Sequence, residues 1–480
     1  MAITSASGID AAPRQQTLST NYIDFTSSAT EGWAQQYLPD LMEKEAEIYG
    51  KRTIAGFLAQ VGAEESSTSD RVIWSEQGRL HLAYKATNED VSANIFTVTA
   101  DVDGNTIDGS AGNVHGMRVG DIVLVSNASL TLRGYVSAIA AATATVLPYG
   151  AANFDTAGFS DSAGAGAYRM LVVGSEFEKG TDGRTAANSP KFTSYSNKHI
   201  IMKDYYEVSG SDVSQIGWVE VAGEEGQNGY LWYLKAEGDT RARFTDYLEM
   251  TMLEAVTAHA DAGAIGGTDG GALQDGTQGL FSAIEARGHQ TTGVTGVNAA
   301  TDLAEFDAIL AAFDQNGAIE ENMMFVNRGT SLAMDDMLAS MNSYGAGGTS
   351  YGVFDNEEDM ALNLGFSGFR RGSYDFYKSD FKYLNDLGTR GALNDTVTNI
   401  RGVVVPAGVS SVYDEQLGKN MKRPFLHVRY RSSQTDDRKL KTWVTGSVGA
   451  KTSGKDTMEI HYLSERCLIT QGANNFMLMN

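Results

Sequence analysis

One helical pattern in the middle of the chain constrains the fold more than any other feature. From about Gly226 to His259 apolar residues recur with a period of 3.6, which predicts a helix of roughly 50 Å. The apolar positions are Leu231, Leu234, Phe244, Tyr247, Leu248, Met252, Ala255 and Val256. The opposite, solvated or interface face carries Lys235, Asp239, Arg243, Asp246, Glu249 and Glu254. Such a helix argues against a purely β surface protein.

Strand patterns lie on both sides of this helix. Residues 70–84 and 198–208 alternate between apolar and polar side chains, as half-buried strands do. The end of the chain predicts four strands, at 425–431, 439–444, 458–463 and 467–470. Residues 280–404 mix short helices and strands. The predicted fold class is therefore α+β.

Residues 89–170 differ from the rest of the chain in composition. They hold no lysine, no tryptophan, eight acidic residues and three arginines, and are rich in Ala, Gly, Thr and Val. Four short strands joined by Gly/Asn turns predict a small β-barrel or sandwich, at 95–98, 117–125, 132–139 and 143–147. Because exposed hairpin tips tolerate insertions, residues 86–170 are interpreted as a domain inserted between two strands of a host domain.

Overall composition excludes several classes of protein. The chain has 480 residues and a formal net charge of −23, so its surface as a whole does not suit phosphate binding, which needs dense Lys and Arg. One cysteine, Cys467, excludes a disulfide framework and a Cys-based zinc cage, and is typical of a reducing compartment. No apolar run approaches the roughly 18–20 residues of a membrane span, and residues 1–15 show no secretory signal. With 53 glycines and 6 prolines, turns rely on flexible glycine.

Residues 1–70 are interpreted as an N-terminal arm. A polar stretch is followed by short amphipathic helical patterns, one of them around Trp33. Helices this short are marginal alone, so they must pack on something. The sequence leaves open whether that partner is the chain's own core or another subunit.

Motifs that could carry chemistry are weak. The segment 449–456 nearly matches a phosphate-binding loop, but Asp456 replaces the hydroxyl residue and a strand pattern follows where a helix is required. Asp101, Asp103 and Asp108 have the alternating oxygens that calcium favours, without the closing Glu of an EF-hand, so a polar hairpin tip is the preferred interpretation. Cys467 lies among alternating strand residues, which favours a buried thiol over a nucleophile. No catalytic site and no cofactor is predicted.

The strongest charge asymmetry lies at residues 419–455, with ten Lys/Arg and two acidic residues. One hypothesis is contact with DNA. The favoured one pairs this basic strip with the acidic surface of a neighbouring copy, because charge complementarity fixes register and the strip lacks interleaved aromatics. The residues proposed for contacts between subunits are Arg429, Arg431, Arg438, Lys439, Lys441, Glu249 and Trp33.

The order of these elements resembles a known family. The major capsid (head) proteins of tailed bacteriophages, which share the HK97-like shell fold, have passages similar to Val72 to Glu76, Ser196 to Gly210, Arg241 to Val256, Ser464 to Cys467 and Gln471 to Phe476. The resemblance covers residues 70–85 and 170–480 in order. Residues 86–170 depart from the family's minimal plan.

The resemblance implies a domain plan. Following the arm at 1–70, strands of an extended loop (E-loop) occupy 71–85 and 171–205 around the insertion at 86–170. A peripheral domain comprises 206–262 and 405–480, with a spine helix at about 226–259, and an axial domain comprises 263–404.

The resemblance also implies a function. The chain is then a non-catalytic structural protein that self-assembles as hexamers and pentamers into the icosahedral head around double-stranded DNA. Assembly takes place in the bacterial cytoplasm, without a membrane. The implied partners are portal, scaffold or protease, and decoration or auxiliary capsid proteins, with weak contact to packaged DNA. The alternative is a secreted surface-layer or adhesin-type β-rich protein, against which the missing signal and the long helix argue.

Overall fold

The computed structural model divides the chain into two compact units, Ser75–Ser194 and a larger unit formed by the residues on either side, through Trp74 and from Tyr195. The described residues are 63–79, 81–110, 113–159, 167–184, 192–211, 221–222, 228–229, 231–257, 276–316, 319–342, 368–393, 399–407, 409–414, 419–446 and 454–480. Strands β2 (Arg71–Gln77) and β9 (Phe192–Lys198) pair where the chain passes from one unit to the other.

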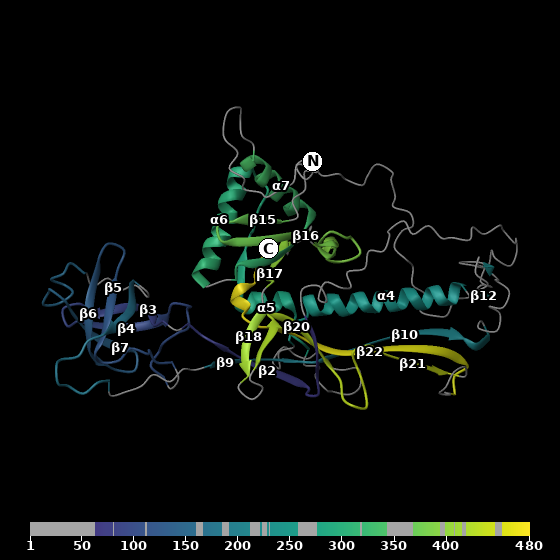
Figure 1. Ribbon diagram of the computed structural model, residues 1–480, viewed down its shortest axis with the longest axis horizontal. Helices are drawn as coiled ribbons and strands as arrows, with labels where there is room; N and C mark the ends of the chain where they lie inside the picture. The colour runs from purple at the N-terminus through teal and green to yellow at the C-terminus, as the bar shows by residue number, and fades with distance from the viewer. Residues whose placement is uncertain are drawn as a thin grey trace. The chain divides into compact units, whose positions relative to one another are not determined.

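The unit Ser75–Ser194 is built around a closed barrel of six strands (Figure 1). Its strands pair in the order β3-β4-β7-β6-β5-β8, and each neighbouring pair is antiparallel. Their bounds are β3 Ala83–Asp90, β4 Ile95–Asp101, β5 Asp121–Ser126, β6 Thr131–Ile139, β7 Thr143–Pro148 and β8 Tyr168–Ser175. A closed barrel leaves no unpaired strand edge.

Alternation of side chains along the strands fills the barrel with an apolar core that contains several aromatic rings. Phe96 on β4 is fully buried, and its ring meets those of Phe154 at 4.9 Å and Tyr168 at 5.6 Å, both edge to face. Gly134 on β6 faces this core, because a Cβ there would lie 2.2 Å from a methyl group of Val146. The close approach of β6 and β7 at this point therefore requires a residue without a side chain.

The barrel corrects the predicted boundaries of the insertion. The four strands expected within 95–147 are present as β4 to β7, and the barrel alternative replaces the sandwich. Residues 83–85 and 171–175 were assigned to the extended loop, but they belong to β3 and β8, which pair with each other and close the barrel. The barrel thus extends beyond 86–170 on both sides.

The barrel is expected to lose stability as the pH falls below about 6.5, the ordinary pKa of histidine. Nε2 of the buried His115 donates to the carbonyl oxygens of Ala140 and Thr143, at 3.1 and 3.2 Å, and burial lowers the pKa of the ring. The unfolded chain therefore takes up a proton before the folded barrel does. Stability declines from the unfolded-state pKa down to the depressed folded-state pKa.

Urea unfolding of the barrel, followed by pulsed hydrogen exchange with a labelling pulse at one fixed pH, measures this dependence. His115→Gln keeps a donor and is expected to flatten the pH dependence. His81→Gln, at an exposed position of the same unit, is the matched control and should leave the wild-type slope unchanged. An equal slope in wild type and His115→Gln would contradict the assignment.

The larger unit contains two main sheets (Figure 1). The first sheet pairs in the order β1-β20-β22-β10, and β21 also pairs with β22. The bounds are β1 Ala63–Ser67, β10 Ile200–Ser209, β20 Leu426–Arg431, β21 Lys441–Gly446 and β22 Thr457–Thr470. β22 is 14 residues long and holds the sheet together, because it pairs with β10 on one side and with β20 and β21 on the other.

Helix α4 (Leu231–Glu254) covers one face of the first sheet. Phe244 and Leu248 pack against Ile460 and Tyr462 of β22, and side chains at even positions of β10 join this core. The predicted helix is confirmed. It is 24 residues long, from Leu231 to Glu254 rather than from about 226 to 259, and it continues through Gly238. Because residues alternate along a strand, the odd positions of β10 and β22 form the opposite face of the sheet.

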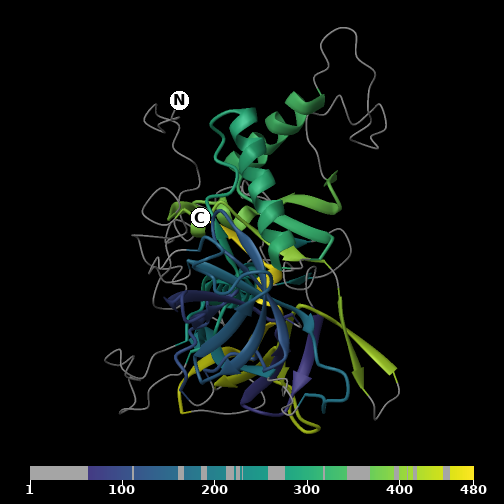
Figure 2. The same cartoon turned by 90° about the vertical axis from the view of Figure 1, so that its left-hand side faces the viewer.

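The second sheet pairs in the order β13-β23-β17-β14-β16-β15 and carries two helices that lie side by side (Figure 2). Its strands are β13 His289–Thr291, β14 Glu321–Val326, β15 Gly368–Arg371, β16 Tyr374–Asp380, β17 Gly402–Pro406 and β23 Met477–Met479. The helices are α6 Ala299–Asn316 and α7 Arg328–Asn342. Phe306 and Phe313 of α6 pack with Met334 and Met337 of α7 over this sheet.

Smaller elements complete the larger unit. They are α5 Leu280–Arg287, the 3-10 turns η2 Lys382–Leu384, η3 Arg390–Ala392 and η4 Ala473–Asn475, and the strand pairs β11 Val221–Ala222 with β12 Asn228–Gly229 and β18 Val409–Asp414 with β19 Lys419–Pro424. A shared apolar core joins α4, α5 and both sheets through Met252, Leu280, Val403 and Leu468. The structure therefore is α+β, as predicted, with an additional closed barrel.

Two strand predictions at the end of the chain need correction. Residues 458–463 and 467–470 were expected as separate strands, but both lie within the continuous β22. The polar residues Ser464, Glu465 and Arg466 between them are buried rather than looped out. Their polar groups are paired inside the unit, so the strand continues through them.

Candidate functional site

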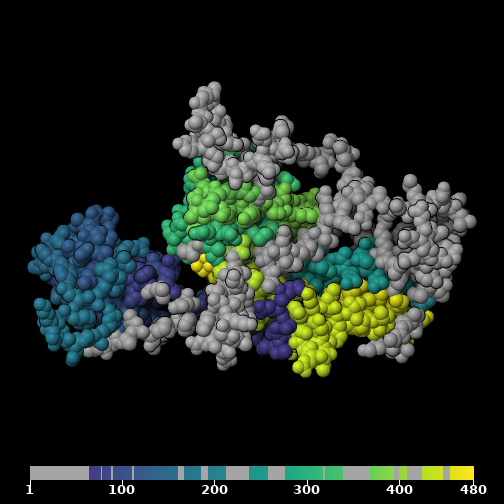
Figure 3. All heavy atoms as spheres, in the orientation of Figure 1, coloured from purple at the N-terminus to yellow at the C-terminus, as the bar shows by residue number. Residues whose placement is uncertain are grey.

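The outer face of the first sheet, defined as the face opposite α4, carries the basic residues singled out in the sequence. One end of this face is covered, because Val72 and Trp74 of β2 and Tyr195 of β9 pack on Cys467 and Ile469. Arg287 caps this cluster with its guanidinium 4.3 Å from the Tyr195 ring centre. Figure 3 shows the atoms of β1 and β2 (purple) directly beside those of the C-terminal strands of the first sheet (yellow).

Acidic residues of the same chain neutralise the basic strip at β1. This strand runs parallel to β20, from Ala63 opposite His427 to Ser67 opposite Arg431. Arg429 binds Glu65 at 2.9 Å, Lys439 binds Glu64, and Arg431 binds Asp70. The β1 sequence, Ala-Glu-Glu-Ser-Ser, has no large apolar side chain to bury, so backbone hydrogen bonds and these ion pairs hold it.

Glu465 is the deepest anion of the strip. Its side chain is 5% exposed and lies between Arg438, at 2.5 Å, and Arg431, at 3.2 Å. Breaking a buried pair leaves an uncompensated charge, which is strongly destabilising. Arg466, also buried, donates to the hydroxyl of Ser464 and to the Lys439 carbonyl oxygen, and burial lowers its pKa.

The structure places most of the proposed inter-subunit residues together. Five of the seven lie on or beside β20 and β21, and each of these binds an acidic group of its own chain. They are Arg429, Arg431, Arg438, Lys439 and Lys441. Glu249, expected on the solvated or interface face of the helix, is 7% exposed. Its negative charge opposes the lowering of the pKa of buried Arg466. Trp33 lies outside the described residues. The structure contains a single chain, so the proposed pairing of the strip with a neighbouring copy stays a prediction. Within the chain, much of the positive charge of the strip is already paired with acidic residues.

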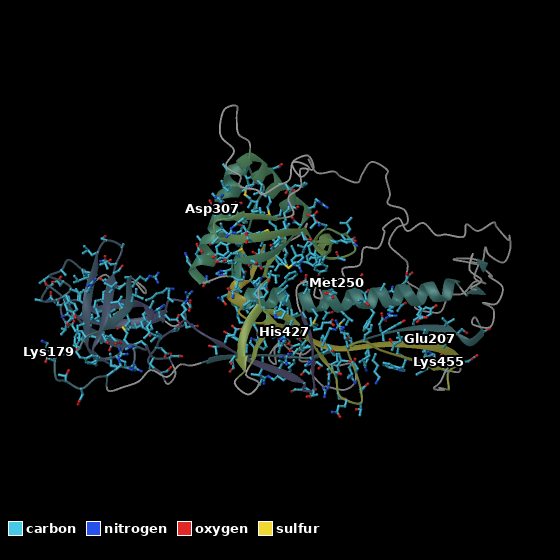
Figure 4. The ribbon with its side chains drawn as sticks, in the orientation of Figure 1. Lys179, Glu207, Met250, Asp307, His427 and Lys455 are labelled. Carbon is cyan, nitrogen blue, oxygen red and sulfur yellow. The ribbon has the colours of Figure 1, made fainter. Side chains whose placement is uncertain are left out.

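Three aromatic rings form a ladder across the other end of the outer face, which β2 and β9 do not cover. Trp443 of β21 stacks on His461 of β22 at 5.2 Å, and His461 stacks on Tyr205 of β10 at 5.9 Å. Tyr205 ends the ladder and is 57% exposed. At the end of the same strands Lys455 binds Glu207 at 2.6 Å, and the two side chains lie beside each other in Figure 4.

The weak metal candidate is a hairpin tip whose carboxylates have protein partners. Asp101 accepts hydrogen bonds from the backbone and side chain of Asn105, and Asp103 binds Arg79 at 2.7 Å. Asp108 accepts from the backbone and hydroxyl of Ser110, which lowers its pKa. Within the described residues no group of three or more His, Cys, Asp or Glu side chains is arranged to hold a metal ion.

Two further motifs now have structural positions. Cys467 is a buried free thiol, as predicted, and burial raises its pKa to about 12, which keeps it protonated. Its Sγ lies 3.7 Å from Nε2 of His199. The phosphate-loop-like segment is followed at Thr457 by β22 and not by a helix, in agreement with the rejection of that motif. No helix in the described part of the chain is long and apolar enough to cross a membrane.

Sequence reasoning missed Glu64, Glu65 and Asp70 as partners of the strip. Glu65 lies 364 residues from Arg429 in sequence, and only the parallel pairing of β1 with β20 brings them together. The run Glu64-Glu65 in an otherwise polar segment was the available signal. The aromatic ladder was also missed, because it depends on the register of three strands.

Comparison with known proteins gives structural similarities. No protein-family model and no curated protein sequence matches the chain. A structure from Gordonia phage Cozz has 8% identity and a TM-score of 0.40, covering 96% of this chain and 97% of that chain. One from Microbacterium phage Oxtober96 has 10% identity and a TM-score of 0.37, covering 95% and 99%. The capsid structure of cyanophage P-SCSP1u has 10% identity and a TM-score of 0.34, covering 64% of this chain and 80% of that chain.

Proposed function

We propose that this chain is the major capsid protein of a tailed bacteriophage, a non-catalytic subunit that self-assembles into the icosahedral head around double-stranded DNA. The observation that carries the proposal is α4, a 24-residue helix packed along a sheet of long antiparallel strands. The passages that resemble the shell family follow this framework. Val72 to Glu76 lies in β2, and Ser196 to Gly210 runs from the end of β9 through β10. Arg241 to Val256 runs through α4 to two residues beyond its end, Ser464 to Cys467 lies in β22, and Gln471 to Phe476 follows β22 through η4.

The domain plan follows from this assignment. The first sheet with α4 is the peripheral domain with its spine helix, and the second sheet with α6 and α7 is the axial domain. This assignment moves β23 (Met477–Met479) from the range 405–480, expected to be peripheral, into the axial domain, because β23 pairs with β17 and β13. The ribbon β2–β9 is the base of the extended loop, and the barrel is inserted into that loop. The ion-paired strand β1 anchors the N-terminal arm at its root. The partners are further copies of the chain, portal, scaffold or protease, and decoration proteins.

Negative-stain microscopy of the purified recombinant chain tests the proposal. We expect angular shells or rings of five and six subunits. Flat lattices would instead support the surface-layer alternative, and dispersed monomers across a range of salt and protein concentrations would overturn shell formation. Low salt should favour assembly, because charge-guided contacts weaken with screening.

A further inference from the structure

Strand β10 lies at the edge of the first sheet. Among the described residues it pairs with β22 along its whole length, Ile200 opposite Arg466 to Ser209 opposite Thr457, and with no other strand. Its side chains on the outer face of the sheet include Ile201, which is 52% exposed, Lys203, which is exposed, and Tyr205. A strand edge without a second strand partner is a template for another strand, and natural proteins normally cover or block such edges. The backbone N–H of Tyr205 donates to Oδ1 of Asp204 at 2.9 Å, a local hydrogen bond that strand pairing would replace.

We infer that the β10 edge pairs with β10 of a second copy of the chain, antiparallel and centred on Tyr205, across a twofold axis. The inference deepens the proposed shell function, and it rests on that function only for where the contact is used. A self-complementary strand is what a twofold contact requires, because the same surface must serve both copies.

Geometry first restricts the possible registers. Residues directly opposite each other in an antiparallel pair project to the same face of the sheet. If α4 of both copies is to cover the same face of the joined sheet, the axis must stand perpendicular to the sheet. An odd-numbered residue then always meets an odd-numbered residue of the second copy, and the strand must be centred on a residue.

Charge then selects among these centres. Centring on Lys203, Asp204 or Glu207 would place two like charges directly opposite each other, which is destabilising. Centring on Met202 or Tyr206 leaves Lys203 opposite an uncharged residue. Centring on Tyr205 places Lys203 opposite Glu207 of the second copy, and the twofold axis creates this opposite-charge pair twice. Glu207 also binds Lys455 of its own chain at 2.6 Å, but Glu459 lies directly opposite Glu207 on β22 and shares the same lysine, so the two carboxylates outnumber the one ammonium group.

The aromatic ladder favours the same centre. Tyr205 is the exposed end of the stack Trp443–His461–Tyr205, so one side of its ring has no aromatic neighbour within this ladder. In the inferred register the two Tyr205 rings meet at the axis, and the ladder continues into the second copy. Cross-strand aromatic pairs of this kind stabilise sheets by roughly 0.2–1 kcal/mol each.

Disulfide trapping of the full-length chain tests the register. In the inferred contact the two Cα atoms at position 205 lie roughly 4.5–5.5 Å apart, within the range that a disulfide spans. Tyr205→Cys is therefore expected to give a disulfide-linked dimer on mild oxidation, seen as the major band in a non-reducing gel. The only native cysteine, Cys467, is fully buried and does not compete.

Ile201→Cys is the matched control. It lies on the same strand and face with nearly equal exposure, 52% against 57%. The register separates the two copies of this position by about eight residues, roughly 27 Å, which no disulfide spans. A dimer from Ile201→Cys but not from Tyr205→Cys, or equal dimer from both, would overturn the inference.

A charge exchange shows whether a missing dimer band results from the changed charges or from misfolding of the variant. In the Tyr205→Cys background, Lys203→Glu places four carboxylates around the axis and should abolish the dimer band. Adding Glu207→Lys restores the opposite-charge pairs and should restore the band. This change removes the ion pair of Glu207 with Lys455, but Glu459, directly opposite position 207, keeps an anion beside both lysines. A dimer band that stays unchanged in both variants would contradict the register. If the Tyr205→Cys variant forms shells without the crosslink, this contact is refuted and the proposed function stands. If it forms crosslinked dimers but no shells, the contact stands and the proposed function is refuted.

Discussion

Replacing Phe244 by alanine is expected to lower the free energy of unfolding of the larger unit by about 3–5 kcal/mol. Phe244 is 1% exposed and packs α4 on the first sheet together with Leu248, with its ring 6.0 Å from that of Tyr462. The substitution removes both the transfer free energy of the ring and its contacts around the resulting cavity. A helix within a protein gains most of its stability from tertiary packing, so α4 is expected to loosen first.

Tryptophan fluorescence during urea unfolding reports on this unit alone. The five tryptophans of the chain all lie outside Ser75–Ser194, and Trp443 lies within the sheet that α4 covers. Tyr247→Ala is the matched control, because Tyr247 is one turn away on the same helix and is 43% exposed. Its unfolding midpoint should stay close to that of the wild type. Equal shifts for the two variants would show that α4 is not anchored through Phe244.

The regular elements of the larger unit could be predicted because each has a local signal. The 3.6-residue period at 231–254 reflects a helix with one buried stripe, and the alternation at 200–208 reflects a strand between two different environments. The continuity of β22 could not be predicted in the same way. Ser464, Glu465 and Arg466 interrupt the apolar pattern, yet they are buried because polar groups from residues 431–439 satisfy them.

The limits of the barrel were predicted only approximately, because composition and structure change at different residues. The distinctive composition begins after Lys85, whereas β3 begins at Ala83 and pairs with β8 on the far side of the insertion. Local patterns identify strands such as β4 and β7. They do not identify which two strands close a barrel, since closure is decided by pairing between residues far apart in sequence, such as Tyr84 and Met170.

The candidate surface was likewise predictable only in part. The basic strip at 419–455 is visible in the sequence, but its partners Glu64, Glu65 and Asp70 depend on a parallel strand from the other end of the chain. The charge pairing observed within the chain joins the strip to β1 and its neighbour Asp70, whereas pairing with a neighbouring copy stays a prediction. A surface that is already neutralised offers a neighbouring copy less charge than the sequence indicates. Among the described residues β10 has a strand partner on one side only, and this edge, rather than the strip, carries the inferred contact.

Replacing Phe96 by alanine is expected to destabilise the barrel by about 3–5 kcal/mol and to leave the larger unit unchanged. Phe96 is fully buried, with edge-to-face contacts to Phe154 and Tyr168 at 4.9 and 5.6 Å. Such pairs add roughly 0.5–1.5 kcal/mol beyond the area that they bury. Typical domains have a total stability of about 5–15 kcal/mol, so the loss is a large share of it.

Hydrogen exchange of peptides from residues 83–175 measures the loss, and tryptophan fluorescence provides an internal reference. The barrel unit contains no tryptophan, so the fluorescence transition of Phe96→Ala should coincide with that of the wild type while the barrel peptides exchange much faster. Leu147→Ala, 44% exposed on β7 of the same barrel, is the matched control and should leave exchange nearly unchanged. If Phe96→Ala shifted the fluorescence transition as far as Phe244→Ala does, the two units would unfold as one, and the barrel would not be an independently folded insertion.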